Sequence, residues 1–245
     1  MPASPRLLLI ASLTALAACQ LPASQTDAAL TETGEMVALS GGAGGAENAC
    51  FTCHGMQGQG DGVAVPRLAG LDAGYLQKQM EDYAADVRHH DVMSAIARRM
   101  DADSRRDVAL YYAGLAPPAT VARPAMPMPA IWNGDPARGI TACSTCHGSD
   151  GQGVGPGNPA VSAQPAAYTI DQLNQWRRAQ RRNDPRNVMS QAVASLTDRE
   201  VVAIAIWLES RPAAPAPESA AAIASNAASA AAGSATSRGP RRPDR

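Results

Sequence analysis

Two short stretches of the chain combine cysteine and histidine at a spacing that can hold a cofactor. They are Cys50-Phe51-Thr52-Cys53-His54 and Cys143-Ser144-Thr145-Cys146-His147. Cys-x-x-Cys-His is the attachment sequence of c-type haem, because each thiol can add to one vinyl group while the adjacent histidine reaches the iron. Two copies predict two covalently bound haem c groups. The expected attachment residues are Cys50, Cys53, Cys143 and Cys146, and the expected axial ligands are His54 and His147.

A zinc site is the alternative for two pairs of cysteines. Zinc sites of this kind usually place ~15–20 residues between the pairs, whereas a far longer stretch separates Cys53 from Cys143. Zinc also does not require the histidine that follows each pair. The pattern therefore favours haem, and with it electron transfer.

The sixth ligand of each iron decides between electron transfer and chemistry on a small molecule, since a firmly held second ligand favours electron transfer. After His147 the sequence contains one methionine, Met189, and no further histidine, lysine or cysteine. Met189 is therefore the expected ligand of the second iron. The first half offers more candidates, which are Met56, Met80, Met93, Met100, Lys78, His89 and His90.

An internal repeat narrows this choice. One shift in numbering carries Cys50 onto Cys143 and, after a short insertion, carries Met93 onto Met189. Two of the other methionines align with leucines, which is typical of core positions. We therefore expect Met93 to ligate the first iron, and the alternatives are His89 and His90.

The repeat also predicts a second contact for each histidine. Pro66 and Pro159 occupy matched positions after His54 and His147. A ligating histidine usually donates its other ring N–H to an oxygen, which fixes the orientation of the ring. Each proline carbonyl is expected to accept that hydrogen bond, and the alternative is an ordinary turn proline.

Helices are expected to position these residues. Apolar residues recur with helical spacing over 75–87, and the repeat places a second such helix over 171–182. Asp101 and Thr197 are suitable N-caps for a later helix in each half, and no stretch alternates as a strand would. The sequence predicts an all-α fold of two tandem domains, residues 45–115 and 133–211, each wrapped around one haem and joined by a proline-rich linker at 116–132.

The N-terminus has the features of an export signal. Residues 1–18 hold Arg6 and then an apolar run that is shorter than the ~20 residues of a membrane span. Leu16-Ala17-Ala18-Cys19 resembles the bacterial lipobox, so Cys19 is the expected lipid attachment site. The alternative is ordinary cleavage and a soluble secreted protein. Residues 19–44 are expected to form a flexible tether, and residues 212–245 a disordered Ala/Pro/Ser-rich tail.

Charge argues against nucleic acid as a partner, because the formal net charge of −1 provides no basic field. The two halves nevertheless differ. Residues 46–115 contain seven basic and ten acidic residues, whereas residues 134–211 contain eight and seven. Such a dipolar body can present different ends to an electron donor and an electron acceptor.

Residues 45–211 resemble tandem class I cytochromes c, most closely dihaem proteins of the cytochrome c4 type. The resemblance rests on ordered motifs in both halves, which include Cys50-x-x-Cys53-His54-Gly55, Gly60-x-Gly62, Pro66-x-Leu68-x-Gly70, Met93-x-x-Ile96-Ala97, Cys143-x-x-Cys146-His147-Gly148, Pro159 and Met189. It implies that the matched histidines and methionines ligate iron and that the proline carbonyls receive the histidine N–H groups.

The resemblance also implies a function in the cell envelope. Such proteins carry single electrons from a quinol-oxidising complex to a terminal oxidase or reductase at the periplasmic face of the membrane, and no residue is expected to be catalytic. One alternative is the electron-transfer subunit of a periplasmic dehydrogenase. Another is a dihaem peroxidase or thiosulfate-oxidising enzyme, which needs an open or exchangeable iron position.

Overall fold

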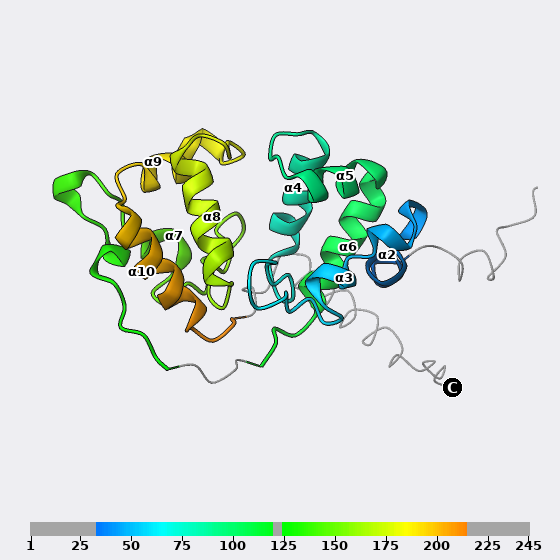
Figure 1. Cartoon of the computed structure of the whole chain (residues 1–245), viewed down its shortest axis with the longest axis horizontal. Coiled ribbons are helices and arrows are strands. Elements are labelled where there is room, and N and C mark those ends of the chain that lie inside the picture. Colours follow the sequence, from blue (N-terminus) through cyan, green and yellow to red (C-terminus); the bar gives the residue numbers. More distant parts are fainter. Residues whose placement is uncertain (1–32, 120–123, 215–245) are drawn as a thin grey trace, which may run out of the picture. The chain divides into compact units, whose positions relative to one another are not determined.

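The structure consists of short helices joined by turns (Figure 1). The computed structural model describes residues 33–119 and 124–214. Within these ranges there is no β-strand, and a single isolated bridge joins Asp135 and Ile140. The expected all-α class is confirmed. No helix in the described ranges is both long enough and apolar enough to span a membrane.

In the first repeat, α4 packs against α5 and α6, and α2 packs against α6. The elements are α2 (Gly34–Ser40), η1 (Gly42–Gly44), η2 (Ala46–Asn48), α3 (Phe51–His54), α4 (Ala73–Ala84), α5 (Asp91–Arg99) and α6 (Ala102–Gly114).

In the second repeat, α8 packs against α9 and α10. The elements are η3 (Ala130–Asn133), η4 (Pro136–Arg138), α7 (Ser144–His147), α8 (Ala166–Arg177), η5 (Pro185–Asn187), α9 (Val188–Val193) and α10 (Asp198–Glu209).

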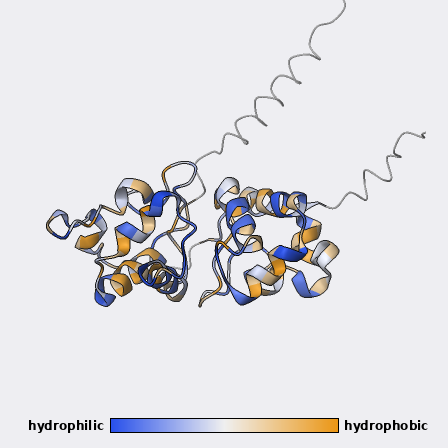
Figure 2. Ribbon diagram, turned by 90° about the horizontal axis from the view of Figure 1, so that it is seen from above, coloured by the Kyte–Doolittle hydropathy of each residue, from blue (hydrophilic) through white to orange (hydrophobic). Residues whose placement is uncertain are grey.

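Each repeat contains a hydrophobic core. The core of the first repeat includes Leu76, Val108 and Tyr112. The core of the second repeat is built around Trp132 and Trp207, whose ring centroids lie 4.8 Å apart. Figure 2 shows hydrophobic and hydrophilic residues interleaved along the helices, as expected where one face of each helix is buried.

The predicted N-caps are present. The carboxylate of Asp101 accepts the backbone N–H of Ser104 at 2.7 Å, which starts α6. Thr197 and Glu200 form a capping box at the start of α10.

Helices α4 and α8 begin and end earlier than the apolar pattern predicts. The carboxylate of Asp72 accepts the N–H of Tyr75 at 2.8 Å and so starts α4 at Ala73. Asp86 and Ala179 occupy matched positions just beyond the two helices and have φ angles of 61° and 54°. A left-handed residue cannot continue a right-handed helix, so both helices stop before these positions.

Helix α2 corrects the expected start of the first domain. The sequence predicts a flexible tether over 19–44, but Val37 and Ala38 of α2 are buried in the core that α6 helps to form. Gly34 permits this packing, because a Cβ there would clash with the carbonyl oxygen of Asp107 in α6. The folded part of the first repeat therefore begins no later than Thr33, whose hydroxyl accepts the N–H of Met36 at 3.2 Å.

Several sequence predictions fall outside the described residues. They are the signal peptide at 1–18, the lipid attachment site Cys19, a short part of the linker at 120–123 and the C-terminal tail beyond residue 214.

Candidate haem sites

Short helical turns present the two Cys-x-x-Cys-His motifs. In each, the backbone N–H of the histidine donates to the backbone carbonyl of the first cysteine. His54 donates to Cys50 and His147 to Cys143, both at 2.9 Å. Residues at i, i+3 and i+4 of a helix share one face, so both thiols and the imidazole lie on the same side of each turn. Cys50, Cys53, Cys143 and Cys146 are all free of disulfides.

The described surroundings of the cysteines do not complete a zinc site. Burial raises the pKa of Cys50 to about 11 and raises the pKa of Cys143 above its ordinary value, so both are thiols at neutral pH. In the described part of the chain, no group of three or more His, Cys, Asp and Glu side chains is placed to hold a metal ion.

Each histidine is held in the tautomer that leaves Nε2 free for a metal. The Nδ1 atom of His54 lies 2.9 Å from the carbonyl oxygen of Pro66, and Nδ1 of His147 lies 2.9 Å from that of Pro159. A carbonyl can only accept, so Nδ1 carries the proton and Nε2 keeps its lone pair. Burial also lowers the pKa of both imidazoles, which keeps them neutral. The hydrogen bond predicted from the repeat is thus present twice.

A glycine turn brings each proline back to its histidine. The N–H of Gly60 donates to the carbonyl of His54 at 2.8 Å, and the N–H of Gly153 donates to that of His147 at 2.8 Å. Both glycines have left-handed φ angles, 78° and 84°. A Cβ at Gly60 would also clash with the carbonyl oxygen of Val65, so the turn requires glycine.

The two candidate methionines lie in the first turns of equivalent helices, and both are partly buried. Met93 is in α5, and its backbone N–H donates to Nδ1 of His90 at 3.2 Å. Met189 is in α9 and packs against the second core. Asp184 accepts the backbone N–H of Ser190 at 2.9 Å. A side chain from the preceding loop therefore holds the start of each methionine helix.

The other candidates of the first half are engaged elsewhere. His89 is exposed and lies between the carboxylates of Asp86 and Asp91, at 2.8 and 3.2 Å. His90 serves as the N-cap of α5. The Nζ atom of Lys78 bonds to Asp82 and donates to the carbonyl of Asn183 at 2.8 Å. The remaining methionines are in the core or exposed: Met80, Met100 and Met56.

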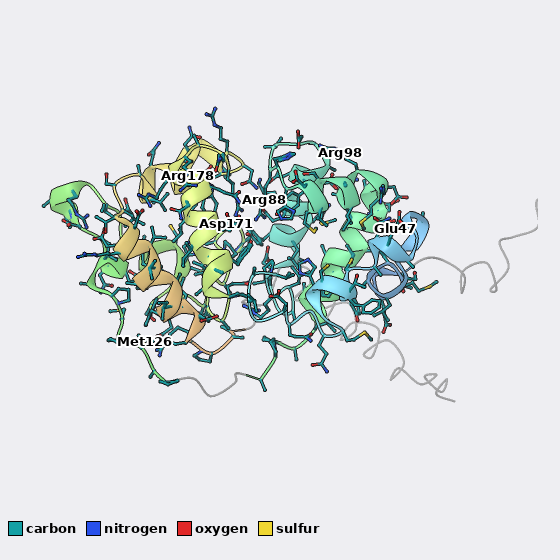
Figure 3. The ribbon with its side chains drawn as sticks, viewed as in Figure 1. Glu47, Arg88, Arg98, Met126, Asp171 and Arg178 are labelled. Atoms are coloured by element: carbon teal, nitrogen blue, oxygen red, sulfur yellow. The ribbon has the colours of Figure 1, made fainter. Side chains whose placement is uncertain are left out.

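A polar cluster between the repeats was missed by sequence reasoning. Arg88 donates to the side-chain oxygen of Gln79 at 2.9 Å and to that of Gln172 at 2.6 Å. Arg181 donates to the same two oxygens, at 3.0 and 2.5 Å. We call Gln79, Arg88, Gln172 and Arg181 the inter-repeat cluster; all four are buried. Figure 3 labels Arg88 within it.

Both arginines of the inter-repeat cluster are buried cations that form no ion pair with any carboxylate in the described ranges. The Cζ atom of Arg88 lies 4.6 Å from the ring centroid of Tyr83, and that of Arg181 lies 4.0 Å from the ring of Trp176. Buried cations ordinarily require anionic partners. Haem carries two propionate carboxylates, so this donor set fits that group.

The chain matches known proteins over both repeats. The family model for cytochrome c matches residues 41–116 and 139–212. The thiosulfate dehydrogenase electron acceptor of Stutzerimonas stutzeri (strain A1501) is 36% identical over 188 residues, which cover 70% of this chain and 83% of that protein. Cytochrome c4 of Thiocapsa roseopersicina is 35% identical over 171 residues, which cover 67% and 88%.

Solved structures agree with these relatives. A crystal structure of reduced cytochrome c4 from Pseudomonas stutzeri gives a TM-score of 0.62 at 27% identity and covers 66% of this chain and 93% of that chain. Thiosulfate dehydrogenase (TsdBA) from Marichromatium purpuratum gives a TM-score of 0.64 at 34% identity over 73% of this chain. The present chain spans 40% of that longer protein.

The two matched Cys-x-x-Cys-His turns, the paired histidine–proline hydrogen bonds and the agreement over both repeats lead to one assignment. The chain belongs to the cytochrome c family and is a dihaem electron carrier of the cytochrome c4 type, with two tandem domains that each carry one covalent haem c.

Proposed function

We propose that this protein is the electron acceptor of a periplasmic thiosulfate dehydrogenase and passes the electrons on to a terminal oxidase or reductase. The observation that carries the proposal is the similarity to two thiosulfate dehydrogenase electron acceptors. The second, from Thiomonas intermedia (strain K12), is 36% identical over 183 residues. Both matches cover 70% of this chain, more than one haem domain occupies, which supports a shared role for the pair.

The stoichiometry suits this donor. Joining two thiosulfate ions through a new sulfur–sulfur bond gives tetrathionate and releases two electrons. Each haem supplies a one-electron couple when bound. Two haem domains in one chain therefore match the electrons of one turnover.

Under the proposed ligand set, both sites transfer electrons and neither reacts with small molecules. His54 and Met93 are assigned to the first iron, and His147 and Met189 to the second. Nε2 of each histidine is the free lone pair, since Nδ1 is engaged by Pro66 or Pro159. A thioether sulfur favours the reduced metal and raises the potential relative to a second histidine. With both axial positions closed, neither site offers a place for substrate.

Other residues are assigned to hold the groups in place. Cys50, Cys53, Cys143 and Cys146 are the proposed thioether attachment points, and Arg88 and Arg181 the proposed partners of propionate carboxylates. Cys19 is the proposed lipid anchor, which would keep the carrier at the periplasmic face of the membrane. Substitution of Cys19 by serine should then release the protein into the soluble fraction.

The test is reduction of the oxidised holoprotein by purified thiosulfate dehydrogenase, followed in the visible spectrum. Rapid reduction of both haems that requires thiosulfate supports the proposal. The comparison is a purified quinol-oxidising complex with quinol as donor. Faster reduction by the quinol complex, with slow reduction by the dehydrogenase, would assign the protein to the general respiratory chain instead. Ready carbon monoxide binding by the reduced protein would indicate an open iron position and hence an enzyme.

A further inference from the structure

The part of the second repeat that surrounds Met189 is strongly basic. Between Arg177 and Arg199 the sequence contains six arginines and two aspartates. The matched segment of the first repeat, residues 84–103, contains three arginines and four aspartates. The two methionine helices therefore lie in opposite electrostatic surroundings, although the repeats share one fold.

Four of these arginines are exposed on one end of the second repeat. Arg178 follows α8, Arg182 and Arg186 lie in the loop before α9, and Arg199 is in the first turn of α10. Figure 3 shows Arg178 at the end of α8 that leads toward α9. We call Arg178, Arg182, Arg186 and Arg199 the arginine face.

Hydrogen bonds fix these segments next to one another. Arg177 donates to the carboxylate of Asp198 at 2.7 Å, which holds the start of α10 against the end of α8. Nε of Arg182 donates to the carbonyl of Ala179 at 2.8 Å, which folds the loop back onto the end of α8. The arginine face therefore lies on segments that adjoin α9, where Val188 is 51% exposed beside Met189.

The arginine face is only partly neutralised within the described part of the protein. The carboxylate of Asp198 interacts electrostatically with Arg178. None of the four arginines forms an ion pair at contact distance with a described carboxylate. The two aspartates of the segment are already engaged, Asp198 with Arg177 and Asp184 with Ser190. An apolar centre with an unpaired charged rim is the usual composition of a protein docking surface.

The loop that carries Arg186 is held in an unfavourable conformation. Arg186 and Asn187 both have left-handed φ angles, 57° and 56°. Residues with side chains rarely adopt that region, and two in succession are rarer. This loop is also where the second repeat is longer than the first.

The matched end of the first repeat has no comparable surface. Arg98 pairs with Asp86 at 2.9 Å, and Arg99 pairs with Glu47 at 3.2 Å. Asp103 pairs with Arg106 at 2.9 Å, and Asp91 lies 3.2 Å from the ring of His89, so the charges at this end are matched. A partner with surface carboxylates would therefore be attracted to the second repeat more strongly than to the first.

We propose that the arginine face docks a redox protein whose own docking surface is rich in carboxylates, so that electrons cross to or from that protein through the second haem. One electron crosses in each encounter, and one centre is oxidised as the other is reduced. The proposal rests on the electron-carrier function. It does not depend on which protein is the donor.

Charged small-molecule oxidants test the surface directly. The reduced holoprotein is oxidised by ferricyanide, an anion, and separately by hexaammineruthenium(III), a cation, at several ionic strengths. The test variant carries Arg178→Gln, Arg182→Gln and Arg186→Gln. The matched control carries Arg98→Gln, Arg99→Gln and Arg106→Gln in the first repeat. Midpoint potentials are measured in each protein, so that rates are compared at equal driving force.

We expect oxidation by ferricyanide to fall at least about fivefold in the test variant at low ionic strength, because the steering charge is lost. Its dependence on salt should weaken, and oxidation by the ruthenium cation should become faster. The control should change neither rate by more than about twofold. Equal ferricyanide rates for the wild type and the test variant would overturn the proposal.

A second arm distinguishes a protein partner from an anionic lipid surface. Polyglutamate is added as a soluble competitor in the ferricyanide assay, and binding to phosphatidylglycerol vesicles is measured by sedimentation. Stronger inhibition of the wild type than of the test variant by polyglutamate supports the proposal. Loss of vesicle binding in the test variant with equal polyglutamate inhibition would assign the surface to lipid. If thiosulfate dehydrogenase fails to reduce the wild type, the proposed donor is refuted. The ferricyanide and polyglutamate results would still test the arginine face.

Discussion

The side-chain amide of Gln164 forms two hydrogen bonds with the backbone of Arg67. Its Oε1 atom accepts the N–H of Arg67 at 3.0 Å, and its Nε2 atom donates to the carbonyl of Arg67 at 3.0 Å. Both residues are buried, and they belong to different repeats. Arg67 directly follows Pro66, the hydrogen-bond partner of His54, so the link between the repeats reaches the edge of the first haem site.

Gln164→Ala should therefore weaken the junction between the repeats. Removal of the amide leaves a buried N–H and a buried carbonyl without partners, which costs on the order of 1–3 kcal/mol for each group. We expect the free energy of unfolding of the holoprotein to fall by that order, measured by guanidinium denaturation. Gln180→Ala is the matched control, because Gln180 is exposed. If Gln164→Ala and Gln180→Ala change the free energy of unfolding equally, the junction contributes nothing measurable to stability.

His90 should stabilise Met93 through the N-cap of α5. His90→Ala removes the acceptor for the Met93 N–H, whereas His90→Asn keeps an acceptor at the N-cap. We expect the far-red iron–methionine absorption of the first haem to disappear at a lower temperature in His90→Ala and to recover in His90→Asn. A bis-nitrogen, low-spin spectrum of the first haem in the wild type at neutral pH that is lost in His90→Ala would show that His90 is a ligand and not a cap.

Glu200 should make the second repeat sensitive to acid. Hydrogen bonding to Arg138 and to the backbone of Thr197 lowers the pKa of Glu200 to about 2, below the roughly 4.3 of an unfolded glutamate. A lowered folded pKa means that the stabilisation is complete above the unfolded pKa and is lost as pH falls through about 2. Glu200→Gln should therefore unfold at lower denaturant than the wild type at pH 7, and the difference should vanish near pH 2.

The control for this pH dependence is Glu35→Gln, a change at an exposed glutamate in the first repeat. If the difference in stability to denaturant between Glu200→Gln and the wild type stays constant from neutral pH to acid, the ionised carboxylate does not have this role.

The haem sites were predictable because their determinants are local or repeated. Cys50, Cys53 and His54 lie within one helical turn, and the histidine–proline hydrogen bond closes a loop within one repeat. The N-caps Asp101 and Thr197 act on residues three positions away. Such short-range chemistry can be read from a single sequence.

In the sequence, the only sign of the inter-repeat cluster is that its residues occupy matched positions in the two repeats. Gln79 aligns with Gln172 on equivalent helices, and Arg88 aligns with Arg181 in the loops that follow them. Identical polar residues at matched positions were the available signal. Their contacts, however, join residues as far apart as Arg181 and Gln79, which are separated by 102 positions. No local pattern specifies such a contact, because it exists only once two folded repeats meet.

Helix α2 was missed for a related reason. It has seven residues, too few for a helix to be stable alone or to show a clear period. Its stability comes from the close approach of Gly34 to α6, which is a tertiary contact. Asp184 was missed likewise, because its bond to Ser190 spans a loop of irregular conformation.

Near-infrared magnetic circular dichroism of the oxidised holoprotein tests the ligation of both irons most directly, because histidine–methionine and bis-histidine irons give charge-transfer bands at different energies. Coordination by Met93 and Met189 predicts histidine–methionine bands whose intensity accounts for two haems. It also predicts that Met93→His and Met189→His each convert half of that intensity and lower the potential of one haem while the other stays nearly unchanged. A wild-type spectrum with a bis-nitrogen or five-coordinate iron, or one substitution that converts both haems, would contradict independent histidine–methionine ligation in the two repeats.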